Sequence, residues 1–80
     1  MNIPGKGKYL LAGGFRAVIV RLKNLGGQWV WQGGIEDHYT GAIMITSTWH
    51  PDGTHAAHPM YSVVAKWSER AAEKLRAAKR

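Results

Sequence analysis

The stretch from Gly41 to Gly53 (GAIMITSTWHPDG) constrains the fold of this chain most, because it joins an apolar run to a strong turn signal. If the run is a strand, the even-numbered residues 42–48 lie on one face and the odd-numbered residues 43–49 on the other. Apolar residues begin both faces, so we expect a central strand inside a curved sheet or small barrel rather than a strand on an open surface. The strand ends at His50–Gly53, because proline presets φ and an Asp-Gly pair accepts left-handed backbone.

Three earlier segments also carry strand signals. Tyr9–Leu11 is a short apolar segment before a glycine pair, and Phe15–Lys23 (FRAVIVRLK) is rich in β-branched residues. Alternation places the odd-numbered residues 15–19 of this second segment on one face and the even-numbered residues 18–22 on the other. Gln28–Gln32 follows the turn residues Asn24–Gly27, which indicates a hairpin.

The C-terminal segment indicates an amphipathic helix with two alternative starts. Apolar residues recur at helical spacing from Met60 to Ala78. Pro59 could occupy the first helical position, or Tyr61–Val64 could form a last short strand with Ser68 capping a helix of about a dozen residues. Trp67 falls on the apolar stripe and is expected in the core.

Together these signals predict an α+β fold. It consists of a small curved antiparallel β-sheet, or partly open barrel, of four to five strands with a C-terminal amphipathic helix. Residues 1–8, which contain a proline and two glycines, are expected as a flexible arm. Residues 9–80 are expected to form one domain.

The net charge of +6 is concentrated at the two ends of the chain. Residues 1–23 hold five Lys or Arg residues and no acidic residue, and residues 66–80 hold six against two acidic residues. Residues 24–65 hold three acidic residues and no Lys or Arg. An anionic partner is therefore expected to meet the first strands and the last helix.

The composition narrows the classes of protein to consider. The chain has no cysteine, so it has neither a disulfide framework nor a thiolate metal site. Its longest apolar runs are too short to cross a bilayer, and its N-terminus lacks the apolar core of a signal peptide. We expect a soluble protein of the cytoplasm with no membrane partner.

Cationic and aromatic side chains are the candidate binding residues. Trp29 and Trp31 share a strand face and could form a stacking platform for bases, although tryptophans also serve small domains as core residues. Basic residues of the last helix, with Lys79 and Arg80 beyond it, could follow a phosphate backbone or be simple solubilising charges. The candidate set is Arg16, Arg21, Lys23, Trp29, Trp31, Arg70, Lys74 and Arg76.

Catalysis and metal binding have little support in the sequence. His50, Asp52, His55 and His58 form H-x-D-x-x-H-x-x-H. His55 and His58 could bind one metal with His50 or Asp52, but the spacing matches no zinc signature and better suits solvated loop histidines, with a pH-sensitive segment or a partner contact as further alternatives. The serines lack a nucleophile-elbow context. We therefore expect no enzyme, no bound metal and no cofactor.

Several short motifs recur in a known family. They are Lys8–Leu10, Gly14 with Arg16–Ile19, Gly33–Ile35, Trp49–Gly53 and His58–Val64. In these motifs the chain resembles a family of small phage-encoded proteins across residues 8–64. The resemblance implies a compact β fold and a phage or prophage origin, and it supplies no catalytic residues. Small phage proteins often block a host protein or sequester a defence signal.

The leading hypothesis is a non-enzymatic phage accessory protein that inhibits a host target in a bacterial defence system, as anti-CRISPR and related counter-defence proteins do. Its partner would be a host protein or a ribonucleoprotein complex. The alternatives are a basic DNA- or RNA-binding module and a protein that sequesters an anionic nucleotide. The oligomeric state is left open.

Overall fold

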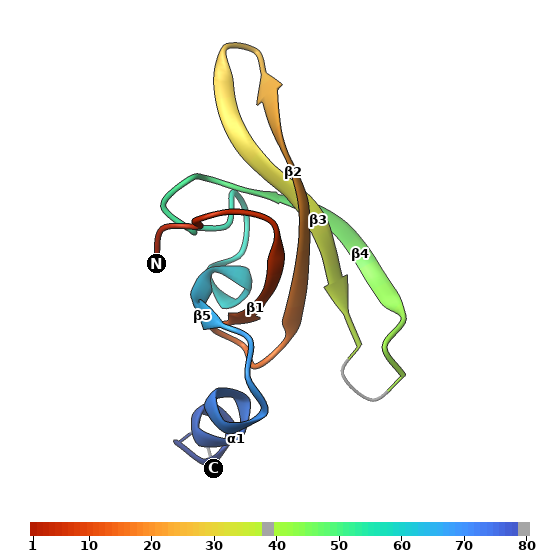
Figure 1. Ribbon diagram of the computed structural model, residues 1–80, viewed down its shortest axis with the longest axis vertical. Coiled ribbons are helices and arrows are strands. Elements are labelled where there is room, and N and C mark those ends of the chain that lie inside the picture. Colours follow the sequence, from red (N-terminus) through yellow and green to blue (C-terminus); the bar gives the residue numbers. More distant parts are fainter. Residues whose placement is uncertain (38–39, 79–80) are drawn as a thin grey trace.

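The computed structural model describes residues 1–37 and 40–78, and it holds a five-stranded antiparallel sheet and a C-terminal helix (Figure 1). The elements are β1 (Gly7–Leu11), β2 (Arg16–Leu25), β3 (Gln28–Glu36), β4 (Ile43–Trp49), the 3₁₀ helix η1 (Pro59–Tyr61), β5 (Val63–Lys66) and α1 (Glu69–Ala78). The strand order is β4-β3-β2-β1-β5, so the sheet is open and not a closed barrel. The predicted α+β fold is confirmed. Lys79 and Arg80 lie outside the described residues.

β4 is an edge strand, so its expected position at the centre of the sheet is wrong. The last strand, β5, pairs with β1 and not with β4, which leaves β2 in the middle of the order. Ile43, Met44 and Ile45 at the start of β4 are exposed. The apolar run in this strand therefore does not mark a buried position, and the prediction that it avoids an open surface is also wrong.

Three β-bulges interrupt the alternation of side chains. Val20 in β2, Met44 in β4 and Val64 in β5 each stand between two paired residues and have no partner in the ladder. The flanking pairs are Ile19–Gly33 and Arg21–Gln32, Ile45–Ile35 and Ile43–Glu36, and Ala65–Leu10 and Val63–Leu11. An extra residue reverses which face the following side chains occupy. All three extra residues are exposed hydrophobics.

The bulges correct two predicted side-chain positions. Leu22 lies opposite Trp31, which packs against the core, so Leu22 is on the face of Ile19 and not on the face of Val18. Ile43 lies opposite Glu36 and contacts Gly34, so it shares a face with Thr46 and not with Trp49. The period-two pattern fails at these residues because it assumes a strand without an extra residue.

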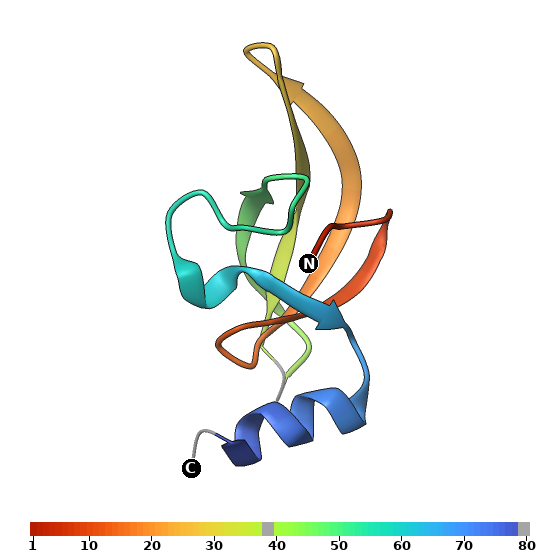
Figure 2. The same cartoon turned by 90° about the vertical axis from the view of Figure 1, so that its left-hand side faces the viewer.

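The core lies on one face of the sheet, which we call the closed face. The N-terminal residues and the segment between β4 and β5 cover this face (Figures 1 and 2). Its buried residues are Ile3, Tyr9, Leu11, Ala17, Ile19, Ile35, Trp49 and Val63. Trp49 is 0% exposed and donates its indole N–H to the carbonyl of Tyr61 at 2.7 Å, which ties the covering segment to β4.

The first residues, expected as an arm, lie against this core. Ile3 is buried, and its backbone N–H donates to the carbonyl of Pro51 at 3.0 Å. The terminal ammonium of Met1 donates to the carbonyl of Val63 at 3.2 Å. β1 begins at Gly7, two residues before the predicted strand.

The structure selects the second of the two helix starts. The Ser68 hydroxyl accepts the backbone N–H of Ala71 at 3.0 Å, which is the capping bond expected before a helix that begins at Glu69. The short strand before it is Val63–Lys66, two residues later than predicted. Trp67 lies between β5 and α1 and is only half-buried, so its expected place in the core on a helical stripe is wrong.

The molecule is elongated, with extents of 40 × 23 × 21 Å. The hairpin of β2 and β3 projects at one end, and α1 lies at the other in both views (Figures 1 and 2). The glycines at the hairpin tip, Gly26 and Gly27, both have positive φ, as a two-residue turn requires.

Candidate binding surface

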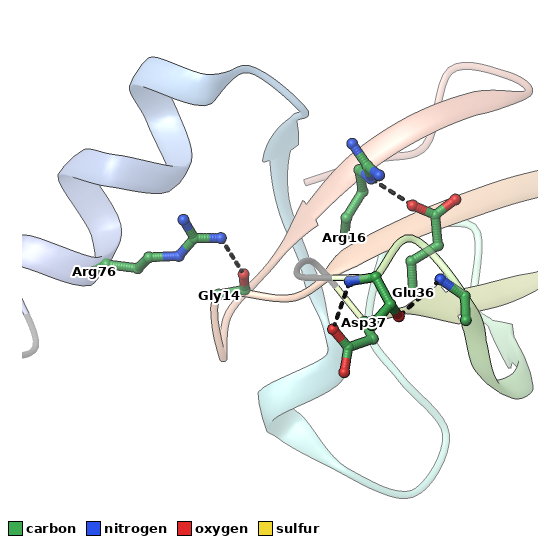
Figure 3. Close-up of polar contacts among 7 residues, drawn as sticks. Gly14, Arg16, Glu36, Asp37 and Arg76 are labelled. Atoms are coloured by element: carbon green, nitrogen blue, oxygen red, sulfur yellow. Dashed lines mark hydrogen bonds and ion pairs between the residues drawn. The ribbon is translucent and has the colours of Figure 1, made fainter.

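Two of the predicted binding arginines are held by contacts within the fold (Figure 3). The Arg16 Nε lies 2.6 Å from the Glu36 Oε2, and the Arg16 guanidinium lies 5.2 Å from the centre of the Trp67 ring. Arg76 donates from Nη2 to the carbonyl of Gly14 at 3.5 Å. Both side chains are partly buried, so their first role is to join α1 and the segment before it to the sheet.

The predicted residues of the hairpin divide between the core and solvent. Trp31 packs against the core, whereas Trp29 is 55% exposed. The two rings share a strand face, but only Trp29 is largely exposed. Arg21 is exposed, and its Nε donates to the Gln32 Oε1 at 2.6 Å, while Lys23 is half-buried on the same hairpin.

The remaining predicted residues, Arg70 and Lys74, are exposed on α1. Because α1 and the tip of the β2–β3 hairpin lie at opposite ends of the molecule, these cations are far from Trp29 (Figures 1 and 2). The structure thus groups Arg21, Lys23 and Trp29 at one end and the helical cations at the other.

The other face of the sheet, which we call the open face, carries an apolar groove. Val18 lies opposite Gly34, which lies opposite Thr46, so these three residues form one row across β2, β3 and β4. The groove has a volume of about 300 Å³. Its lining residues are Val18, Val20, Gln32, Gly33, Gly34, Ile43 and Thr46. No charged residue is among them.

Glycine creates the floor of this open-face groove. A Cβ on Gly34 would lie 2.9 Å from the Ile43 side chain, so the missing side chain leaves space between Val18 and Ile43. Val20 and Ile43 are each 52% exposed. These residues were not among the predicted binding residues, although both faces of their strands are apolar in the sequence.

α1 closes only one end of the open face. Leu10 and Ala65, which pair across β1 and β5, line a crevice with Ala71 and Leu75 of the helix. The row of Val18, Gly34 and Thr46 lies beyond this crevice. Contiguous exposed apolar surface of this kind is typical of interaction sites.

The histidine cluster is a hydrogen-bonded loop and does not form a catalytic dyad. The His55 Nδ1 accepts the backbone N–H groups of Ala57 at 3.1 Å and His58 at 3.0 Å. A neutral His55 therefore carries its proton on Nε2, which donates to the Ser47 hydroxyl oxygen. A ring that donates to serine cannot also take the serine proton, so Ser47 is not activated as a nucleophile.

Burial lowers the pKa of His55, and the neighbouring His58 and His50 lower it further. His55 is thus neutral near pH 7, as its accepting Nδ1 requires. The hydroxyl and backbone N–H of Thr54 both donate to Asp52, and these bonds lower the pKa of its exposed carboxyl group. Within residues 1–37 and 40–78, no three metal-ligating side chains gather into a possible ion site.

Within the described part of the chain, no helix has the length and apolar character needed to cross a membrane. No protein-family model, no curated protein and no solved structure matches this chain. Its function is therefore argued from the geometry of its surfaces.

Proposed function

We propose that this chain is a non-catalytic phage accessory protein that binds a protein of its bacterial host through the open-face groove and thereby inhibits it. We further propose that the target belongs to a host defence system. The observation that carries the proposal is the apolar groove between Val18, Gly34 and Ile43, which no described segment covers. The phage origin rests on the resemblance across residues 8–64.

The chemistry of the groove favours a protein partner over a nucleic acid. Side chains that line it are aliphatic, hydroxyl or amide groups. Cations stand only at its rim, where Arg21 donates to Gln32 and Lys8 pairs with Val18. Readout of a nucleic acid on a sheet relies on cations or aromatic rings within the contact itself. A protein interface instead needs a desolvated apolar centre with polar groups at its rim.

The neighbouring hairpin extends the same surface through Leu25. Leu25 is exposed and pairs with Gln28, on the strand face of Gln32, whereas Leu22 and Trp29 lie on the closed-face side of the hairpin. Arginine is enriched among residues that dominate binding energy, so Arg21, which pairs with the lining residue Gln32, would anchor the rim of the interface.

Affinity capture from a bacterial lysate tests this function with a matched pair of variants. Ile43→Asp places a charge in the groove wall, whereas Val64→Asp places the same charge on an exposed apolar residue of the opposite edge strand. We expect the wild-type chain and Val64→Asp to retain the same host protein, and Ile43→Asp to lose it. Addition of the chain should then inhibit the activity of that protein.

Two treatments separate a protein target from a nucleic acid. Apolar contacts persist as salt rises, whereas phosphate contacts weaken steeply. Capture that disappears after nuclease treatment, or that Ile43→Asp retains as well as the wild-type chain does, would contradict the proposal. Circular dichroism of both variants checks that they remain folded.

A further inference from the structure

The open-face groove has cations on two of its sides, and we call these cations its rim. Lys8 of β1 pairs with the lining residue Val18, so its side chain stands on the open face beside the groove. Toward the hairpin, Arg21 pairs with the lining residue Gln32, and Lys23 follows two residues later on the same face. Lys8 and Arg21 are exposed, and Lys23 is half-buried. The apolar centre therefore lies between one cation on β1 and two on β2.

The positive charge of the rim is not neutralised within the fold. Arg21 donates to the Gln32 Oε1 at 2.6 Å, and this amide oxygen carries no net charge. Among the described residues, none of the three rim cations takes part in an ion pair. In the five strands, all of whose residues are described, the one acidic residue is the buried Glu36, which Arg16 pairs at 2.6 Å. No exposed carboxylate of the sheet therefore competes for the rim.

Lys66 shows that position on the sheet, and not net charge alone, defines the rim. This lysine is also exposed, but it pairs with Tyr9, a core residue, which places the Lys66 side chain on the closed-face side. Lys8 and Lys66 thus lie on neighbouring strands and on opposite sides of the sheet. Comparing the two lysines separates a local contact at the groove from the general attraction of a chain with a net charge of +6.

The spacing of the rim indicates what fits the groove. Neighbouring strands lie ~4.8 Å apart and a strand rises ~3.3 Å per residue, so the backbones at Lys8 and Arg21 are roughly 10 Å apart. The groove lies beside this line, where the missing side chain of Gly34 leaves space between Val18 and Ile43. A peptide segment that crosses the open face can therefore place an apolar side chain in the groove and a carboxylate near each end of the rim.

We infer that the occupant of the open-face groove is an acidic segment of the target protein. An aliphatic or aromatic side chain of this segment enters the groove, and aspartate or glutamate residues on both sides of it meet Lys8 and Arg21. The inference rests on the proposed function, because it names the chemistry of the partner at the same site. The apolar side chain supplies the desolvated centre of the interface, while the carboxylates raise the association rate and disfavour basic segments.

Selection from a displayed library of random short peptides tests this inference. The wild-type chain is the bait, and peptides that also bind Ile43→Asn are removed, because this variant makes the groove wall polar without changing its charge. We expect the remaining peptides to carry an apolar residue with aspartate or glutamate on both sides of it. Their sequences thus report the chemistry of the groove directly.

Charge reversal of the rim gives the matched comparison, with one selected peptide followed by fluorescence anisotropy. Lys8→Glu and Arg21→Glu should each weaken binding by roughly five- to tenfold, because each replaces an attraction by a repulsion. Lys66→Glu changes the net charge equally on the other side of the sheet and should change the affinity by less than about twofold. Circular dichroism checks the fold of each variant, and Lys8→Gln and Arg21→Gln repeat the test with a smaller change of charge.

The outcomes separate this inference from the proposed function. Peptides that depend on Ile43 but show no excess of acidic residues would leave the groove as a protein-binding site and overturn the acidic partner. Equal losses in the Lys8, Arg21 and Lys66 variants would assign the effect to net charge and overturn the rim contacts. A selection that yields no peptide dependent on Ile43 would overturn the docking of such a segment, whereas the proposed function would still stand if the host protein is captured by the wild-type chain and lost by Ile43→Asp.

Discussion

The two faces of the sheet contain similar residues but have different surroundings. On the closed face, Ile19 and Trp49 are buried, whereas Val20 and Ile43 on the other side of the same strands are about half exposed. The difference is which face the chain covers: the N-terminal residues and the segment between β4 and β5 both return to the closed face. Both faces of the sheet are therefore apolar enough to form a core. The core forms on the closed face because the N-terminal residues and the segment between β4 and β5 cover that face.

The tryptophans repeat this comparison at the level of single residues. Trp49 is fully buried with its indole N–H bonded, and Trp29 is on the projecting hairpin with no core around it. The same side chain therefore stabilises the fold at one position and remains available for a partner at the other.

The largest expected effect separates these two tryptophans. Trp49→Ala should lower the free energy of unfolding by about 3–5 kcal/mol, because it empties a large volume in the core. Trp29→Ala should change it by less than about 0.5 kcal/mol. Urea unfolding followed by circular dichroism measures both. Similar losses for the two variants would mean that the hairpin packs as tightly as the core does.

The next prediction compares the adjacent glycines of β3. A Cβ on Gly33 would lie 2.0 Å from the backbone carbonyl oxygen of Val18, so Gly33→Ala should cost about 3 kcal/mol of stability. A Cβ on Gly34 would meet the Ile43 side chain, which is exposed and can move. Gly34→Ala should therefore cost less than about 1 kcal/mol.

The same glycine variants sharpen the functional comparison. Gly34→Ala would partly fill the open-face groove while leaving the chain folded, so capture of the host protein should weaken. Unchanged capture by a folded Gly34→Ala variant would place the interface elsewhere on the molecule.

A smaller effect concerns the end of the open face that α1 closes. Arg16→Ala should cost about 2 kcal/mol, because it leaves the nearly buried Glu36 without its cation. Arg21→Ala removes an exposed hydrogen bond and should cost less than about 0.5 kcal/mol. Thermal or urea unfolding of both variants checks this, and equal costs would contradict the structural role of Arg16.

The smallest effect comes from pH. The pKa of His55 is lowered by burial from 6.5, so the unfolded chain binds more protons just below that pH and the free energy of unfolding falls as pH decreases. The loss should begin below about pH 6.5 and continue until the folded-state pKa is passed. Asp52, with a pKa lowered from 3.8, adds a second decrease at lower pH.

A variant isolates the histidine contribution. His55→Gln should show a shallower change in urea stability between about pH 7 and pH 5 than the wild-type chain does. An equally steep change in the variant would assign the dependence to another group.

Much of the fold could be predicted because its local signals are strong. The β-branched segment of β2, the turn residues Asn24–Gly27 and the Ser68 cap each determine structure through their own chemistry. The open sheet with a C-terminal helix follows from their order. What decides the edge position of β4 is the pairing of β5 with β1, and no residue within β4 carries that information.

The candidate site was harder to predict for a related reason. Leu22 and Ile43 lie on the faces opposite to those expected, because each is separated from the rest of its strand by a bulge. The extra residue is Val20, before Leu22, and Met44, after Ile43. Their positive charge made Arg16 and Arg76 predicted binding residues, yet Arg16 forms an ion pair with Glu36 and Arg76 donates to the carbonyl of Gly14. Trp67 is held beside β1, whose Lys8 carbonyl accepts its backbone N–H, although the two lie far apart in sequence.

The three bulges also bear on how this protein can vary in length. Removing Val20, Met44 or Val64 would join two residues that are already correctly paired, so every other side chain would keep its face and partner. Each of these residues is an exposed hydrophobic that the ladder does not use. Single-residue deletions at these positions would therefore remove surface for a partner while preserving the architecture, and related chains that differ by one residue there could diverge in what they bind.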